Sequence, residues 1–496
     1  MAIGLRFNAQ HQIAVILRPG YLETWVSARK VCCFQNQQDL FLLYCCDRVR
    51  LGVFRGSILG KERRLLRILV GVKLLCLSNG HGEDAIAIRI LLALKQQIPS
   101  LELAALPMVG EGKVYTRHDI PLIGPTQNMP SGGFVYMDGK QLARDLQGGL
   151  LQLTMAQFRV VRSWAKQKKA AILAVGDIVP LLFAWLSGVP YGFVGTAKSE
   201  YYLRDEAGLL PRRTWFEQLE SWSGSVYLPG ERCLMRHRRC KAVFPRDSLT
   251  AQRLRRFSVP AFDLGNPMMD DLDTKQQLRA SSSPKVAKDA SLLTLVLLPG
   301  SRSPEAYRNW QQLVLAMADC LDSFINQPFL FLAAIAPGLE MKPFCKPLEA
   351  EGWQESISKP KGIPKLNPTK TREFSQRQAS LIVTQQAFAA CLQQADFALA
   401  MAGTATEQFV GLGKPAIALP GQGPQFTPAF AEAQTRLLGP SVILLERPDQ
   451  VGNTLQALLE DPDRLHLIAE NGRRRLGKPG AARRIAACFL EQLRKR

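Results

Sequence analysis

Long apolar segments are missing from this chain of 496 residues. The most apolar stretch, residues 171–195, is interrupted by Asp177, Pro180 and Pro190, which is typical of strand, loop and helix rather than of a membrane span. No signal-peptide pattern is found at the start of the sequence. We therefore expect any contact with a membrane to be peripheral.

Patterns that bind metal are missing as well. The pairs Cys32-Cys33 and Cys45-Cys46 lack the C-x-x-C spacing of zinc sites, and Cys233, His237 and Cys240 are too few to form one. The 11 cysteines also lack the pattern of a secreted disulfide scaffold. The sequence predicts reduced thiols in a cytosolic protein, with no metal and no cofactor.

Acidic residues are in the minority. The chain has 42 Asp and Glu against 63 Lys and Arg, a net charge of +21, which favours an anionic partner. No zinc-finger or RNA-binding signature is present, so we do not expect nucleic acid to be that partner. Residues 201–241 interleave aromatic residues with arginines, which favours an anionic membrane surface; the alternative is a half-buried helix with a solvated basic face.

What the sequence does contain is alternating strand and helix patterns in two halves. Its length predicts two sizeable domains, and 47% hydrophobic residues are enough to form their cores. Residues 1–72 lack a sustained period and are treated as an N-terminal appendage. We place the domains at 73–268 and 291–478, with a polar linker at 269–290 and a basic amphipathic helix at 479–496.

The stretch from Asp396 to Phe426 is the clearest single unit. Apolar runs at 397–400 and 416–419 flank a turn of small residues and a run of helix formers, a spacing that predicts two parallel strands joined by a short helix. A helix that starts at Thr404 directs unpaired N–H groups towards the loop.

Small residues at this turn leave room for an anion. Gly403, Thr404 and Ala405 carry no bulky side chain, so the turn is suited to a diphosphate. Glu407, in the first helical turn, can accept hydrogen bonds from sugar hydroxyls, and Gln425 lies in the loop that follows the second strand. The alternative is a plain helix start with a favourably placed glutamate.

A second turn of the same kind opens the later half. Gly300, Ser301 and Arg302 follow an apolar run and precede a helix from Pro304. The planar guanidinium of Arg302 is suited to binding phosphate.

The first half carries polar residues at the ends of its predicted strands. Residues 78–84 form a glycine-broken turn with His81, Glu83 and Asp84 at its tip, without the G-x-G-x-x-G spacing of dinucleotide sites. Asp177 follows the strand at 171–175, where open α/β sheets bind their ligands. The alternative for Asp177 is to cap the helix that follows.

Several runs together resemble one family. LLPGSR at 297–302 and AGTATEQFVGLGKPAIALP at 402–420 look like the lipid-A-disaccharide synthases, and VGD at 175–177, VFPRD at 243–247 and GNPMMDDL at 265–272 follow the family's order and spacing. The resemblance covers residue 73 to the C-terminus and points to a diverged, synthase-related branch. It implies the GT-B fold of glycosyltransferases: two Rossmann-like domains across a cleft, the first for the acceptor and the second for the nucleotide sugar.

The resemblance also implies a chemistry. It gives Asp177 as the catalytic base, with His81 as an alternative, in an inverting transfer of an N-acetylglucosamine-type sugar from a UDP-sugar to a lipid acceptor. Arg302 and the helix start at Thr404 would stabilise the leaving UDP, and Glu407 would hold the ribose, without a metal. The family's first loop reads Gly-Glu-x-Ser-Gly-Asp, and this chain departs from it at residues 79–84.

The expected location is cytoplasmic, peripheral on the inner face of the membrane. Alternatives are another GT-B enzyme, either a lipid-linked glycosyltransferase of cell-wall synthesis or a UDP-sugar epimerase, and a membrane-associated binding protein without catalysis.

Overall fold

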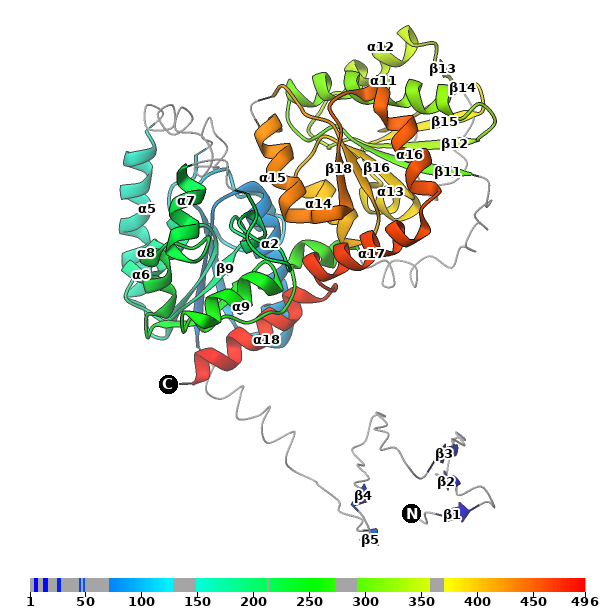
Figure 1. Ribbon diagram of the computed structural model, residues 1–496. Coiled ribbons are helices and arrows are strands. Elements are labelled where there is room, and N and C mark those ends of the chain that lie inside the picture. Colours follow the sequence, from blue (N-terminus) through cyan, green and yellow to red (C-terminus); the bar gives the residue numbers. More distant parts are fainter. Residues whose placement is uncertain are drawn as a thin grey trace. The chain divides into compact units, whose positions relative to one another are not determined.

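The computed structural model describes residues 71–127, 149–211, 215–272, 292–356, 370–423 and 425–495, together with five short strands before residue 50 (Figure 1). The chain divides into two compact units, Met1–Val70 and Gly71–Arg496. In the first unit β1 (Gly4–Phe7), β2 (Gln12–Ile16) and β3 (Trp25–Ser27) form an antiparallel sheet, and β4 (Tyr44–Cys45) pairs with β5 (Arg48–Val49).

The second unit begins with a parallel five-stranded sheet in the order β10-β9-β8-β6-β7. Its strands are β6 (Lys73–Ser78), β7 (Glu102–Pro107), β8 (Ala170–Gly176), β9 (Tyr191–Gly195) and β10 (Cys240–Pro245). Every residue of the central β8 is buried, as expected of a parallel sheet covered on both faces. The carboxyl ends of these strands share one edge, so the polar residues that follow β6, β8 and β9 are neighbours.

Helices connect the strands of this first sheet. They are α2 (His81–Gln97), α3 (Lys113–Thr116), α5 (Leu150–Ala165), α6 (Ile178–Leu186), α7 (Trp215–Ser223), α8 (Pro229–Arg236), α9 (Ser248–Arg256) and the 3-10 segments η1 (Glu200–Tyr202) and η2 (Pro267–Leu272). The predicted turn at 78–84 was wrong at its end: α2 begins already at His81. Gly80, at φ 123°, is the backbone position that allows the helix to start there.

The second sheet has eight strands in the order β13-β14-β15-β12-β11-β16-β17-β18. They are β11 (Leu293–Leu298), β12 (Phe329–Ala334), β13 (Gln354–Glu355), β14 (Thr371–Gln376), β15 (Ala379–Thr384), β16 (Phe397–Ala400), β17 (Ala416–Ala418) and β18 (Val442–Leu444). Successive residues of β11 enter opposite cores: Leu295 packs in the cluster of Trp310, and Val296 in that of Phe409.

One part of this sheet was not predicted. Residues 371–376, for which no strand was predicted, form β14, antiparallel to β15. Thr371 and Phe374 are buried while Arg372 is exposed, so the strand lacks the period-2 alternation of apolar residues that would predict it. Residues 357–369 lie outside the described part.

Helices surround the second sheet, and the last helix of the chain packs against the first domain. They are α11 (Glu305–Ser323), α12 (Lys342–Ala350), α13 (Phe388–Gln394), α14 (Thr404–Gly411), α15 (Pro428–Leu438), α16 (Val451–Leu459), α17 (Pro462–Leu476) and α18 (Ala481–Arg494), with η4 (Gly439–Ser441) and η5 (Pro448–Gln450). The last helix, α18 (red in Figure 1), packs on α2 and β10, and its Phe489 is fully buried. No helix among the described residues has the length and apolar character to cross a membrane.

The stretch from 396 to 426 folds as predicted. Strands β16 and β17 are parallel neighbours, and α14, which starts at Thr404, joins them. Local pattern was sufficient here because each element is short, apolar and bounded by glycine or proline.

Candidate functional site

Two glycine turns meet at the carboxyl edge of the second sheet. Strands β11 and β16 pair in parallel with Leu298 opposite Ala400, so the loops that follow them leave the sheet side by side. The Asn309 side chain on α11 joins these loops, because its Nδ2 donates to the carbonyl of Pro299 at 3.0 Å and to that of Met401 at 3.4 Å. The structure therefore brings together the two predicted anion turns.

The first of these turns requires glycine. Gly300 lies at φ 100°, and a Cβ at this position would be 3.4 Å from the carbonyl oxygen of Met401 in the second turn. Ser301 is exposed and Arg302 is half-buried at the tip of the loop. Burial lowers the pKa of the Arg302 guanidinium, and the carboxylates of Glu305 and Glu83 oppose that shift, so this arginine lies within electrostatic range of the first domain.

The second turn leads into a helix whose start has no side-chain cap. Gly403 is the N-cap of α14 and forms no side-chain cap hydrogen bond, and Thr404 at the first helical position is exposed. Gln434 on α15 stabilises the turn, because its Nε2 donates to the carbonyls of Ala402 at 3.3 Å and Gly403 at 3.1 Å. The half-buried Ala405 adds no bulk. This geometry keeps the positive end of the helix open to an anion.

A third loop joins the two turns. The backbone N–H of Phe426 donates to Oε1 of the buried Glu305 at 2.6 Å. A Cβ on Gly423 would lie 2.1 Å from the carboxyl carbon of the same glutamate, so glycine is needed for this close approach. The half-buried Gln425 is positioned by this anchor. Glu305 and Asn309 were missed in the sequence, where both resemble ordinary polar residues at the start of a helix.

Glu407 is paired with an arginine from the first domain. Nη2 of Arg246 donates to its Oε2 at 2.5 Å, and the two side chains are 8% and 10% exposed. Nη1 of Arg246 donates to the carbonyl oxygen of Thr196 at 2.9 Å. Arg246 belongs to the VFPRD run, but nothing in that run alone indicates its partner.

Two carboxylates lie near each other at the edge of the first sheet. Glu83 in the first turn of α2 accepts a hydrogen bond from Oγ1 of Thr196 at 3.3 Å. Burial, and to a smaller extent the nearby charge of Asp177, raise the pKa of Glu83 from 4.5 to about 7. Glu83 is therefore poised to exchange a proton near neutral pH.

Asp177 adopts the helix-capping geometry considered from the sequence. It is the N-cap of α6, and its Oδ1 accepts a hydrogen bond from the N–H of Val179 at 2.9 Å. Burial raises its pKa, while the bonds from Val179 and from the Asn79 side chain lower it. Its position at the end of β8, beside Glu83, is compatible with both a capping and a chemical role.

The other polar residues of the first turn have different surroundings. His81 opens α2, and its side chain lies outside the described residues. Asp84 is buried and accepts a hydrogen bond from Oγ of Ser78 at 2.6 Å and one from the hydroxyl of Tyr115 at 3.3 Å. Asp84 thus fixes the start of α2 to β6.

The segment 201–241 contains both buried and exposed side chains. Tyr201 and Tyr227 are buried, and the Arg232 guanidinium stacks on the Phe257 ring at 3.8 Å. Leu209, Leu219 and Trp222 are exposed, and Trp222 on α7 is the most exposed of these three at 83%. The side chains of residues 212–216 lie outside the described part, and the membrane patch stays a prediction.

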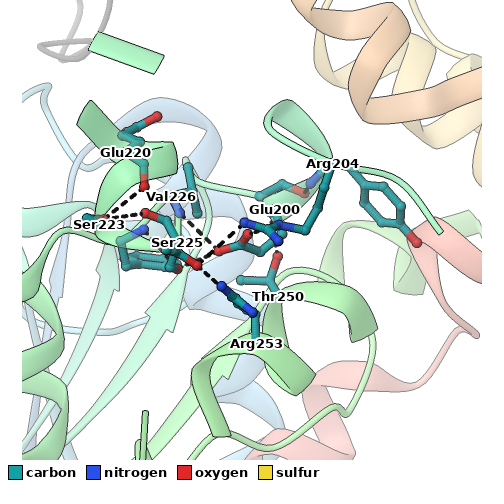
Figure 2. A network of polar contacts seen from close by, with 12 residues as sticks. Glu200, Arg204, Glu220, Ser223, Ser225, Val226, Thr250 and Arg253 are labelled. Carbon is teal, nitrogen blue, oxygen red and sulfur yellow. Dashed lines mark hydrogen bonds and ion pairs between the residues drawn. The ribbon is translucent and has the colours of Figure 1, made fainter. Parts of the chain in front are cut away.

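A buried polar network holds this segment in place (Figure 2). The fully buried Glu200 accepts hydrogen bonds from the Ser225 hydroxyl, from the N–H of Val226 at 2.9 Å and from Nε of Arg204 at 2.8 Å. Nε of Arg253 donates to the Gly224 carbonyl at 2.5 Å. With these groups satisfied, the network fixes the loop after β9, which carries Thr196, without leaving a charge for a ligand.

The described residues contain no group of three or more His, Cys, Asp or Glu side chains arranged to hold a metal ion. The candidate site consists of backbone N–H groups, the arginines Arg246 and Arg302, and the carboxylates Glu83, Asp177 and Glu407.

Comparison with known proteins gives the fold. No protein-family model and no curated protein matches the sequence. Among solved structures, a Listeria monocytogenes protein assigned as a UDP-N-acetylglucosamine 2-epimerase matches at 14% identity with a TM-score of 0.50, covering 86% of this chain and 97% of its own. S. aureus MnaA, solved with UDP, matches at 14% identity with a TM-score of 0.50, covering 86% of this chain and 98% of its own. Acinetobacter baumannii MurG matches at 15% identity with a TM-score of 0.49, covering 85% and 99%. The chain has the two-domain GT-B fold, as predicted, with a Rossmann-like domain around each sheet.

Proposed function

We propose that this chain is an inverting glycosyltransferase that moves an N-acetylglucosamine-type sugar from a UDP-sugar to a lipid acceptor. The observation that carries the proposal is the pair of glycine turns joined by Asn309, with the uncapped start of α14 and Arg302 beside them. Backbone N–H groups and a guanidinium are the donors that a diphosphate leaving group requires. The runs shared with the lipid-A-disaccharide synthases support the same reading.

In the proposed reaction an acceptor hydroxyl oxygen attacks the anomeric carbon of the sugar. The bond from that carbon to the phosphate oxygen breaks, and UDP leaves with the electron pair, stabilised by Arg302 and the N–H groups at Thr404. The hydroxyl proton passes to Asp177 or to its neighbour Glu83, whose pKa burial and the nearby charge of Asp177 raise to about 7. Glu407 accepts hydrogen bonds from the ribose hydroxyls.

The first experiment is a thermal-shift screen of UDP, UDP-sugars and other nucleotides on the full chain. Stabilisation by uridine diphosphates alone is expected, because a ligand that binds only the folded state raises the melting temperature. Transfer of labelled sugar to extracted lipids then tests catalysis. If no uridine nucleotide changes the melting temperature, the proposed donor is wrong.

The nucleotide site has its own test. Glu407→Ala is expected to weaken UDP binding roughly tenfold or more in calorimetry, the size of one or two lost hydrogen bonds to a charged group. Equal affinity of the variant and the parent would remove Glu407 from the ribose site.

A UDP-sugar epimerase is the second candidate, since solved structures with this fold include proteins described as UDP-N-acetylglucosamine 2-epimerases. An epimerase needs no acceptor. Conversion of a UDP-sugar to its epimer without added lipid would therefore favour this alternative over transfer. Tight UDP binding with neither reaction would favour a non-catalytic binding protein.

The lipid acceptor implies peripheral contact with the inner face of the membrane. The exposed Trp222 on α7 and the basic residues of 201–241 are the proposed contact. Sedimentation with vesicles rich in anionic lipid is expected to deplete the protein from solution, and Trp222→Ser to reduce that depletion. Binding that is unaffected by Trp222→Ser would place the contact elsewhere.

A further inference from the structure

The carboxylate proposed for the ribose is held by a side chain that the resemblance does not assign. Arg246 follows β10 in the first domain, whereas Glu407 lies 161 residues further on, in the first turn of α14. The two side chains are 8% and 10% exposed, so their ion pair is largely shielded from water. Among the described residues, the hydrogen bond that the Glu407 carboxylate accepts comes from Nη2 of Arg246 and is made to Oε2.

The arginine is fixed at both ends of its guanidinium. Nη2 holds Glu407 at 2.5 Å and Nη1 holds the carbonyl oxygen of Thr196 at 2.9 Å. Thr196 in turn donates through its hydroxyl to Glu83 at 3.3 Å. Thr196 therefore connects the two sites, since its carbonyl accepts from Arg246 and its hydroxyl donates to Glu83, the proposed proton acceptor.

We propose that Arg246 is a positioning residue for the donor nucleotide: it holds Oε2 of Glu407 so that Oε1 is presented to the ribose hydroxyls. The inference rests on the proposed UDP site and adds to it a residue from the opposite domain. Preorganisation of this kind strengthens binding because the carboxylate loses no rotamer freedom when the ligand arrives.

Arg246 could instead compete with the ribose for Glu407, and its removal would then change UDP affinity in the opposite direction. If the ion pair has to open before the ribose can enter, the arginine competes with the ligand, and its removal strengthens binding. If Arg246 positions Glu407, its removal weakens binding, and only for ligands that carry the hydroxyls.

The experiment is calorimetry of the full chain with UDP and with 2′,3′-dideoxy-UDP. The parent protein is expected to prefer UDP by roughly ten- to a hundredfold. Arg246→Met, Glu407→Gln and the double variant are all expected to bring that preference close to one, without additivity, and Arg246→Lys to restore part of it. The double variant also leaves no unpaired buried charge, so it tests the proposal even if Arg246→Met folds poorly.

Arg436→Met is the matched control. The Arg436 side chain is 9% exposed and donates to the carbonyl of Tyr202 at 3.3 Å, so it joins α15 to the first domain without touching Glu407. It is expected to keep the preference for UDP. If Arg246→Met keeps or increases the preference for UDP over 2′,3′-dideoxy-UDP while Glu407→Gln loses it, Arg246 does not position Glu407. In that case the role proposed for Glu407 still stands. Failure of the parent protein to bind UDP overturns the proposed function and this inference together.

Discussion

Burial controls the acidity of the carboxylates that follow the first sheet. Glu83 has a pKa of about 7 because its side chain is withdrawn from water and lies near Asp177. A group whose pKa is raised in the folded state stabilises the fold at low pH, and that contribution is lost as the pH rises through the folded pKa. Glu83 therefore stabilises the protein most below pH 4.5 and stops doing so near pH 7.

This sign gives the first prediction. Between pH 4.5 and 7 the free energy of unfolding of the parent should fall by roughly 2–3 kcal/mol relative to Glu83→Gln, measured by urea unfolding. Glu102→Gln, which changes an exposed carboxylate on the same sheet, is the control and should follow the parent. A parent that gains stability relative to Glu83→Gln over this range would contradict the assigned environment.

The second prediction separates the two roles of Asp177. Asparagine caps helices as well as aspartate, so Asp177→Asn should change stability by less than about 1 kcal/mol. As part of the proton-accepting pair its loss should lower turnover by orders of magnitude, with little effect on UDP affinity. Turnover rates at several pH values, compared with calorimetry, provide the measurement. Unchanged turnover would leave Asp177 as a cap only.

At the scale of elements, the turns depend on the helices behind them. Helix α11 carries both Asn309, which joins the two glycine turns, and Glu305, which anchors the third loop. The proposed nucleotide site is therefore built by one helix and three loops rather than by a single motif.

The third prediction follows from this arrangement. Asn309→Ala should weaken UDP binding about tenfold and cost about 1–3 kcal/mol of stability, because buried carbonyl groups lose their donor. Asn471→Ala is the matched control, since Nδ2 of Asn471 donates to the carbonyl of Leu438 at 2.7 Å in a similarly buried setting. It should lose similar stability and keep UDP affinity. Equal UDP affinity of both variants would show that the turns hold their shape without Asn309.

At the scale of the whole molecule, the last helix belongs to the first domain. Phe489 on α18 is fully buried, and a Cβ on Gly192 in β9 would lie 2.6 Å from its ring. The end of the chain thus completes the core around a strand that forms some 300 residues earlier, so the first domain depends on both ends of the described unit.

The fourth prediction tests that dependence. Phe489→Ala should cost about 3–5 kcal/mol of stability by leaving a cavity, and Leu467→Ala, at a side chain 53% exposed, should cost far less. Gly192→Ala should destabilise the parent but do little in the Phe489→Ala background, because the clashing ring is gone. Thermal unfolding of the four variants checks this. Additive costs of the two substitutions would contradict the packing.

Most elements and the two glycine turns could be predicted from local sequence patterns. Apolar runs, glycine turns and helix starts at 297–302 and 396–420 are local patterns, and neighbouring residues specify them. Strand β14 was not predicted, since its buried residues recur every third position and do not alternate with polar ones.

Contacts between residues far apart in the sequence could not be predicted and became visible in the folded chain. The pairing of Arg246 with Glu407, the tie of Asn309 to two turns and the return of α18 to the first domain are contacts across 92 to several hundred residues. Burial then sets the acidity of Glu83, which no local pattern encodes. Local sequence determines the backbone conformation of each segment. The protonation and the contact partners of each site residue depend on the distant residues that surround it in the folded chain.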